Sequence, residues 1–195
     1  MRLLLASKSA ARRQMLEAAG VPFERVDAPL DEEEAKQRFG SLAAPDLAMA
    51  LAEAKAGSLT ADASDLVLGS DQTLERDDRT MLSKPRSREH ALEQLRYLSG
   101  RTHRLHSAAA VAEGGQIVWS ATESVSLSVR PLSEAFLSEY LDQEYEVIRW
   151  SVGGYRIEGL GVQLFERIEG SHFAILGMPL LPLLAYLRER GVVGR

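Results

Sequence analysis

The chain of 195 residues contains no cysteine, only two tryptophans and 6% aromatic residues in all. Without cysteine it forms no disulfide bond, has no thiolate nucleophile and builds no cysteine-bound zinc site. Any chemistry it performs must therefore use oxygen and nitrogen groups. The same absence fits a reducing compartment.

Long apolar runs are also missing, and positive charge is not in excess. Leu3–Ala6 is too short for the core of a signal peptide, and no run reaches membrane-spanning length, so we expect a cytoplasmic protein without a membrane partner. The formal net charge of -5 disfavours nonspecific binding to nucleic acid. Local basic clusters are therefore expected to bind a small anion. With 45% hydrophobic and 26% charged residues, the composition is that of an ordinary globule of one domain or two small lobes.

The start of the chain has the layout of a phosphate-binding turn. An apolar strand over 3–6 leads directly into a helix expected over 10–19, which Gly20 ends. Ser9 is the expected N-cap, and the free N–H groups and positive dipole end of a helix favour an anion. Ser7, Ser9, Arg12 and Arg13 are the candidate phosphate ligands here. A solvated basic first turn is the alternative interpretation.

The remaining pattern predicts alternating strands and helices followed by antiparallel strands. Apolar spacing and turn residues predict strands over 23–27, 66–69, 105–111, 117–119, 125–129 and 162–168, and helices over 46–58, 88–98, 133–141 and 180–190. Ser87 is the expected N-cap of the helix over 88–98, and a turn is expected at Glu113-Gly114-Gly115. The antiparallel part, about 100–150, is a candidate second lobe within one domain covering 1–195. No repeat and no low-complexity linker is present.

Asp71 is the candidate catalytic carboxylate. It follows the apolar run Leu66–Gly69, and we expect it at the carboxyl end of that strand, where ligands collect in open α/β sheets. It is suited to binding a divalent metal or to accepting a proton from water. Nearby cations would lower its pKa, which weakens a base and improves a metal ligand. An aspartate that only forms a local turn is the alternative.

Two lysines and one glutamate complete the candidate polar site. Lys55 is surrounded by small residues on its helix, and Lys84 precedes Pro85, which holds it in extended geometry. For each lysine, a solvated surface position is as compatible with the sequence as a role in ligand binding. Glu32 is a candidate metal ligand within the acidic run 31–34, although such runs more often form a solvated face or a helix start.

Two further features of the sequence bear on ligand binding. His103 and His106 are three residues apart, which places them on opposite faces of a strand and argues against a shared metal. The glycine-rich stretch 153–161 flanks Tyr155, Arg156 and Glu158, and such a backbone allows close approach to a flat ligand. A plain connecting turn would also use these glycines.

These segments, in this order, resemble the Maf family of nucleoside triphosphate pyrophosphatases over almost the whole chain. The resemblance rests on motifs that stand here as Ala6-Ser7-Lys8-Ser9-Ala10-Ala11-Arg12-Arg13, Ala52-Glu53-Ala54-Lys55-Ala56, Gly69-Ser70-Asp71, Lys84-Pro85, Ser99-Gly100-Arg101-Thr102-His103 and the zone Gly170–Leu180. The chain departs from the family at Ala10, where proline is usual.

The resemblance implies a Maf/ITPase-like fold of the α/β class, with a mixed twisted sheet flanked by helices and two lobes around a central cleft. It implies cleavage of a nucleoside triphosphate between its α and β phosphates, with Mg²⁺ or Mn²⁺ bridging phosphate oxygens. Asp71 and Glu32 are the candidate protein ligands of that ion. Lys55 and Lys84 would join the phosphate ligands, and Asp71 would orient or deprotonate water. A homodimer is implied as well.

Three positions separate two branches of the family, one similar to dTTP and UTP pyrophosphatases and one to 7-methyl-GTP pyrophosphatases. Gln72 and Glu158 match the 7-methyl-GTP branch, whereas Ala11 matches neither branch. A carboxylate pairs with a positively charged methylated guanine and accepts its N–H groups. Because an alanine cannot stack on a base, Trp150 or Tyr155 is a candidate substitute ring. The alternatives are a dTTP/UTP-type enzyme, a nucleotide-binding module of cell division and septum formation, and, ranked low, a general phosphatase.

Overall fold

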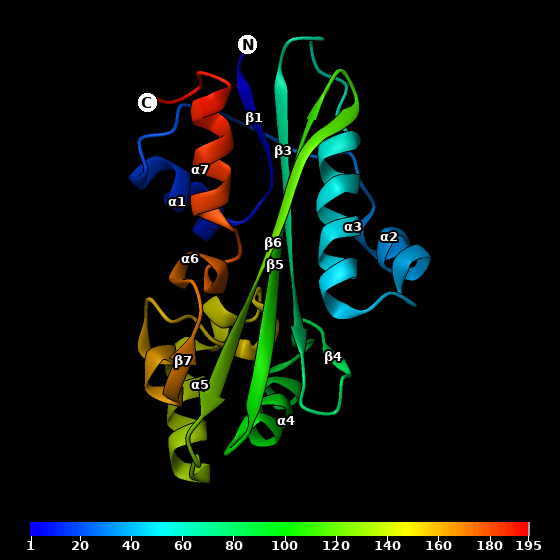
Figure 1. The fold of residues 1–195 in the computed structure, drawn as a ribbon. Coiled ribbons are helices and arrows are strands. Elements are labelled where there is room, and N and C mark those ends of the chain that lie inside the picture. The colour runs from blue at the N-terminus through cyan, green and yellow to red at the C-terminus, as the bar shows by residue number, and fades with distance from the viewer. Residues whose placement is uncertain (195) are drawn as a thin grey trace. The chain divides into compact units, whose positions relative to one another are not determined.

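The computed structural model describes residues 1–194 and contains one mixed sheet with helices packed on its faces (Figure 1). The strand order is β2-β1-β3-β5-β6-β7, with β4 paired to β3. β1 pairs in parallel with β2 and β3, whereas β4 and β7 pair antiparallel with their neighbours. The expected α/β class with a mixed sheet flanked by helices is confirmed.

The chain divides into two compact units, and β3, β5 and β6 contribute residues to both. Among the described residues, the first unit comprises 1–72, 106–123 and 171–194, and the second comprises 73–105 and 124–170. The strands are β1 (Leu3–Ala6), β2 (Glu24–Val26), β3 (Leu66–Glu75), β4 (Met81–Leu82), β5 (Thr102–Glu113), β6 (Gln116–Val129) and β7 (Phe165–Glu169).

The first unit contains five of the seven α-helices among the described residues. They are α1 (Ala10–Ala18), α2 (Glu32–Phe39), α3 (Ala44–Gly57), α6 (His172–Ile175) and α7 (Leu180–Glu189). The second unit contains α4 (Arg88–Leu98) and α5 (Glu134–Ile148), with short 3₁₀ turns at Val152–Gly154 and Leu160–Leu164. The sequence did not predict α6.

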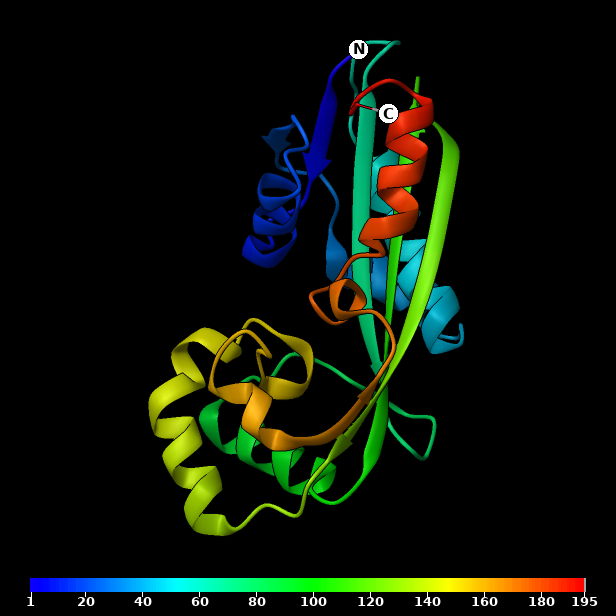
Figure 2. The same ribbon diagram turned by 60° about the vertical axis from the view of Figure 1, so that its left-hand side comes forward.

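Alternation along the buried strands creates the core of the first unit. Leu3 and Leu5 of β1 face α1 and α7, whose Leu16 and Leu183 belong to the same cluster. Leu4, one residue out of phase, faces the opposite side of the sheet, where α3 packs (Figure 2). The parallel part of the sheet is thus covered on both faces, as parallel sheets require.

Alanines allow α3 to pack closely against the sheet. Ala48, Ala52 and Ala56 lie on one face of α3, and all three are fully buried together with Ala108 and Ala110 of β5. Their small side chains leave little space between helix and strand. This close approach brings Lys55, a long side chain of α3, near β3.

Several strand boundaries differ from those that the apolar patterns predict, because β3, β5 and β6 are longer and β7 begins later. The expected strands 117–119 and 125–129 form one continuous strand, β6, and residues 162–164 of the last expected strand form part of a 3₁₀ turn instead. The expected turn at Glu113-Gly114-Gly115 is confirmed, and Gly114 and Gly115 adopt positive φ angles of 56° and 79°. Within residues 1–194, none of the helices has the length and apolar character needed to cross a bilayer.

Candidate active site

Asp71 lies inside β3. The sequence predicted that this strand ends near Asp71, and that prediction was wrong. β3 continues to Glu75 because Leu74 and Glu75 form an antiparallel pair with β4. The neighbouring strand β1 ends earlier than β3, and its end marks the position of Asp71 in the sheet. Leu68 is the last β3 residue paired with β1, so Asp71 lies three residues beyond the parallel ladder, at the carboxyl end of β1.

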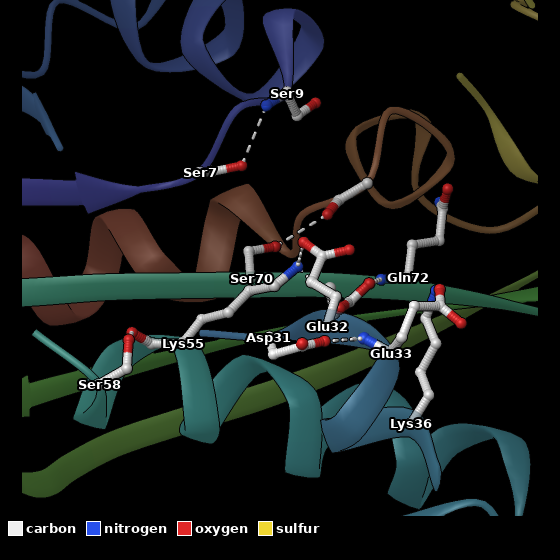
Figure 3. A network of polar contacts seen from close by, with 12 residues as sticks. Ser7, Ser9, Asp31, Glu32, Glu33, Lys36, Lys55, Ser58, Ser70 and Gln72 are labelled. Atoms are coloured by element: carbon white, nitrogen blue, oxygen red, sulfur yellow. Dashed lines mark hydrogen bonds and ion pairs between the residues drawn. The ribbon is translucent and has the colours of Figure 1, made fainter. Parts of the chain in front are cut away.

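Lys55 of α3 contacts two carboxylates in the first unit (Figure 3). Its Nζ lies 2.9 Å from Asp71 Oδ2 and 2.9 Å from Glu32 Oε1, and only 9% of its side chain is exposed. The interpretation of Lys55 as a solvated surface lysine is therefore excluded. Glu32 is the first residue of α2, which Asp31 caps by accepting the N–H groups of Glu33 and Glu34.

Gly69 allows Lys55 to lie this close to Asp71. A Cβ atom at Gly69 would stand 2.2 Å from the carbonyl oxygen of Ala52 and 2.5 Å from the amide nitrogen of Ala56. Both are backbone atoms of α3 and cannot move without shifting the helix. The glycine therefore serves close helix-to-strand approach, since its φ is not in the left-handed region.

The electrostatics of this cluster keep Asp71 ionised. Burial by itself would raise the pKa of the carboxyl, but the positive charges of Lys55 and Arg12 outweigh it and hold the pKa of Asp71 below its ordinary value. The hydrogen bond from Lys55 and the N–H of Gln72, 2.7 Å from Oδ1, act in the same direction. Asp71 is thus a stable anion suited to positioning water or a cation.

The turn between β1 and α1 is folded as its sequence predicts. Ser9 caps α1, with its Oγ accepting the N–H of Arg12 at 3.4 Å, and the N–H of Ser9 donates to Ser7 Oγ at 3.2 Å. Arg13 is partly exposed and lies 3.6 Å from Glu17. Ala11, also on α1, is partly buried.

Arg12 differs from its neighbours because it is buried and braced. Its Nε donates to the carbonyl oxygen of Gly177 and its Nη1 to that of Ser70, both at 2.9 Å. Burial lowers the pKa of the guanidinium, although the charges of Asp71 and Glu32 oppose that effect. A phosphate contact by Arg12 would have to use Nη2. Binding of phosphate by Ser7, Ser9, Arg12 and Arg13 stays a prediction.

Ser70 and Gly177 stand in motifs that carry the family resemblance, but neither was predicted as a residue of the site. The hydroxyl of Ser70 donates to the carbonyl oxygens of Ala108 and Gly177, at 2.8 and 3.0 Å, and the serine is fully buried. A single hydroxyl next to the apolar run Leu66–Gly69 was the available signal. Gly177 has a φ of 105°, and a Cβ there would stand 3.3 Å from the Arg12 guanidinium.

The Gln72 side chain is anchored through its amide nitrogen. Nε2 lies 2.9 Å from Ser107 Oγ, 2.9 Å from the carbonyl oxygen of Ala174 and 3.0 Å from that of Ile175. These carbonyls belong to α6, so Gln72 binds the end of that helix. With the nitrogen engaged, only the oxygen of the amide is left for a substrate, where it acts as an acceptor.

The other sequence-predicted residues belong to the second unit. Lys84 is exposed after β4, and Glu158 is exposed just before the 3₁₀ turn at Leu160–Leu164. The backbone of the glycine-rich segment is held closely: a Cβ at Gly161 would stand 2.4 Å from the carbonyl oxygen of Arg156. An ion pair of 3.1 Å joins Arg156 to Glu144 of α5.

Tyr155 is buried and is unavailable for stacking on a base. Its hydroxyl lies 2.6 Å from His103 Nε2, and its ring packs edge-on against Phe165 with centroids 4.9 Å apart. Burial lowers the pKa of His103 to about 4 and raises that of Tyr155. Trp150, by contrast, is 68% exposed beside Arg149.

No group of three or more His, Cys, Asp or Glu residues within 1–194 is arranged to hold a metal ion. His103 and His106, whose spacing argued against a shared metal, fall in different units. Glu32 and Asp71 are carboxylates that converge on one atom, Lys55 Nζ.

Comparison with known proteins identifies the family. The model of the family described as "Maf-like protein" matches residues 2–190. A nucleoside triphosphate pyrophosphatase of Sphingopyxis alaskensis is 47% identical over 98% of both chains, and a 7-methyl-GTP pyrophosphatase of Rhizobium meliloti is 47% identical over 98% of this chain and 97% of its own.

Among solved structures, a nucleoside-triphosphatase (dITP/XTP pyrophosphatase) of Mycobacterium abscessus matches over 100% of both chains with 18% identity and a TM-score of 0.43, which is too low to bear on fold or function. The match of the family model along nearly the whole chain and the close relatives agree with the motifs around Ser9, Lys55 and Asp71. The chain belongs to the Maf family.

Proposed function

We propose that the protein is a nucleoside triphosphate pyrophosphatase, which hydrolyses its substrate to a monophosphate and pyrophosphate. The observation that carries the proposal is the buried contact between Lys55 and Asp71, which keeps a carboxylate ionised beside a cation at the carboxyl end of β1. Relatives from Sphingopyxis alaskensis and Rhodopseudomonas palustris, 47% and 46% identical, carry that name.

The first unit supplies groups suited to a triphosphate. The N-terminus of α1, capped by Ser9, presents free N–H groups and the positive dipole end, and Arg13 and Lys55 add cationic side chains. Arg12 adds positive charge while it holds Ser70, the residue before Asp71. Lys84, which belongs to the second unit, stays a predicted phosphate ligand. These charges would stabilise the negative charge of the phosphates as the bond breaks.

Asp71 is proposed to orient the attacking water and accept its proton. Its lowered pKa makes it a weak base at neutral pH, so orientation and charge are its larger contributions. Attack at the α phosphorus would form a new P–O bond there and release pyrophosphate as the leaving group. A carboxylate next to the phosphate chain requires nearby cations, and Lys55 already supplies one.

The residues present also fit a divalent cation, Mg²⁺ or Mn²⁺. Such ions are commonly held by one or two carboxylates together with substrate phosphates, and Glu32 and Asp71 direct one oxygen each toward the same atom, Lys55 Nζ. A bound cation would neutralise phosphate charge and polarise the scissile group.

For the substrate, we propose 7-methyl-GTP or another modified nucleotide. The relative from Rhizobium meliloti named a 7-methyl-GTP pyrophosphatase is as similar to this chain as the general pyrophosphatases are. Glu158 provides an exposed carboxylate for a positively charged base, and Gln72 provides an acceptor oxygen. A dTTP/UTP preference is the alternative for this site, and the homodimer stays a prediction.

The decisive experiment measures products. Purified protein is incubated with Mg²⁺ or Mn²⁺ and with 7-methyl-GTP, GTP, UTP, CTP and dTTP, and pyrophosphate and orthophosphate are quantified separately. We expect pyrophosphate with 7-methyl-GTP ranked first, and loss of at least about a thousandfold in rate for Asp71→Asn with nucleotide binding retained. Orthophosphate as the primary product would indicate a general phosphatase, and binding without turnover would indicate a regulatory module of cell division.

A further inference from the structure

The ammonium of Lys55 lies where two carboxylates from different elements converge. Glu32 extends from the first turn of α2 toward Lys55 (Figure 3). Asp71 extends from β3, and each carboxylate places one oxygen 2.9 Å from Nζ. The other oxygen of Asp71 accepts the backbone N–H of Gln72 at 2.7 Å. Lys55 therefore holds the oxygen of Asp71 that remains for a cation.

A divalent cation would need these same oxygens. Mg²⁺ and Mn²⁺ require oxygen ligands in direct contact, and an ammonium within a few ångströms of such an ion is repelled by it. The side chain of Lys55 is buried in this arrangement, where repulsion is screened less than at the surface. The ammonium and a divalent ion cannot both be held by Glu32 and Asp71 in this geometry.

We propose that Lys55 is a built-in counter-ion that occupies the carboxylate pair until a phosphate group draws its ammonium away. This inference rests on the proposed function, because it requires a triphosphate and a divalent cation at the same site. The flexible four-carbon stem of lysine allows the exchange, and phosphate oxygens are strong partners for an ammonium. The divalent ion then takes the carboxylates that Lys55 has left.

One consequence is coupling between the two ligands. Without nucleotide, a divalent ion must compete with the ammonium of Lys55 and binds weakly. With nucleotide, Lys55 pairs with phosphate and the competition ends. By linkage, the cation then strengthens nucleotide binding by the same factor as the nucleotide strengthens cation binding.

The test measures Mn²⁺ binding in the absence of nucleotide, by electron paramagnetic resonance of the free ion. Lys55→Met retains the apolar stem and removes the charge, and we expect it to bind Mn²⁺ at least about tenfold more tightly than the unchanged protein. The matched control is Lys36→Met, which removes a partly exposed lysine 3.5 Å from Glu33 on the same acidic helix. It is expected to stay within about twofold of the unchanged protein.

A second variant tests whether the ion binds the carboxylates in question. Adding Glu32→Gln to Lys55→Met removes the negative charge of one of the two carboxylates, and the gain in Mn²⁺ affinity is expected to disappear. Glu32 is 46% exposed, so its replacement is compatible with folding, which circular dichroism checks for each variant.

Equal or weaker Mn²⁺ binding by folded Lys55→Met would overturn the inference. So would a gain in affinity that survives Glu32→Gln. Nucleotide hydrolysis by the unchanged protein is measured separately. A protein that hydrolyses nucleotides but shows no gain in Lys55→Met retains the proposed function and loses only the counter-ion role. If Lys55→Met gains Mn²⁺ affinity but the unchanged protein hydrolyses no nucleotide, the counter-ion role is retained and the proposed function is rejected.

Discussion

The Nε of Arg12 donates a hydrogen bond of 2.9 Å to the carbonyl oxygen of Gly177, a residue 165 positions further along the chain. The same guanidinium donates to the carbonyl oxygen of Ser70, which directly precedes Asp71. One buried side chain thus connects the N-terminal turn, the strand that carries the candidate catalytic carboxylate and the segment before α7. Its position makes it a brace for the site.

Replacing Arg12 by lysine is expected to destabilise the fold. Lysine cannot make both carbonyl contacts, and hydrogen bonds to charged groups contribute about 1.5–3 kcal/mol each, so we expect the free energy of unfolding to fall by about 2 kcal/mol or more. Urea denaturation measures it. Arg13→Lys is the control, since Arg13 is 42% exposed and 3.6 Å from Glu17, and its effect is expected below about 1 kcal/mol. Equal losses of unfolding free energy in Arg12→Lys and Arg13→Lys would contradict the structural role of the two Arg12 hydrogen bonds.

Gly69→Ala is expected to disturb the contact between α3 and β3. The new Cβ would collide with backbone atoms of Ala52 and Ala56 at 2.2 and 2.5 Å, and we expect a loss of at least about 2 kcal/mol together with reduced activity as Lys55 shifts. Gly57→Ala at the end of α3 meets nothing within 4 Å and should be neutral or stabilising by up to about 1 kcal/mol. Thermal and urea unfolding compare the two. A harmless Gly69→Ala would show that the close approach is dispensable.

His103 is expected to make stability depend on pH. Burial lowers its pKa to about 4 from 6.5, so between these values the unfolded chain binds the proton more readily than the folded protein. The stability from neutral His103 is complete above pH 6.5 and is lost as the pH falls toward 4, by about 3 kcal/mol in total. Urea unfolding at several pH values should show a shallower slope in His103→Gln. Identical slopes would contradict the buried neutral histidine.

Glu158→Gln is expected to change base preference more than rate. Removing the charge while keeping the shape should lower the preference for 7-methyl-GTP over GTP by about tenfold, the equivalent of about 1.4 kcal/mol for one lost charge-assisted contact. Values of kcat/KM for both nucleotides measure it. Glu166→Gln removes another exposed carboxylate of the same unit, on β7, and should leave the preference unchanged. An unchanged ranking in Glu158→Gln would remove Glu158 from base recognition.

Local patterns were sufficient to predict most elements of this fold. Ser9 and Ser87 were identified as N-caps from their positions before amphipathic runs, and the glycine turn of the β5–β6 hairpin from Gly114 and Gly115. The end of β3 was misjudged because Ser70, Asp71 and Gln72 are polar, and polar residues usually mark a turn. Their hydrogen bonds to distant partners allow them to remain inside a strand.

The site was predictable only as a set of residue types. Lys55 and Asp71 were both identified, but their direct pairing depends on Gly69 and on the alanine face of α3, which set a spacing that a sequence does not display. Arg12 resembled Arg13 in the sequence. Only the fold distinguishes them, because the partners of Arg12 lie 58 and 165 positions away.

The most direct test of the central claim is hydrolysis in water enriched in ¹⁸O, followed by mass spectrometry of the products. If water oriented by Asp71 attacks the α phosphorus, one ¹⁸O atom per turnover appears in the nucleoside monophosphate and none in pyrophosphate, and Asp71→Asn forms neither product above background. Label in pyrophosphate, or labelled orthophosphate as the first product, would contradict the proposed reaction.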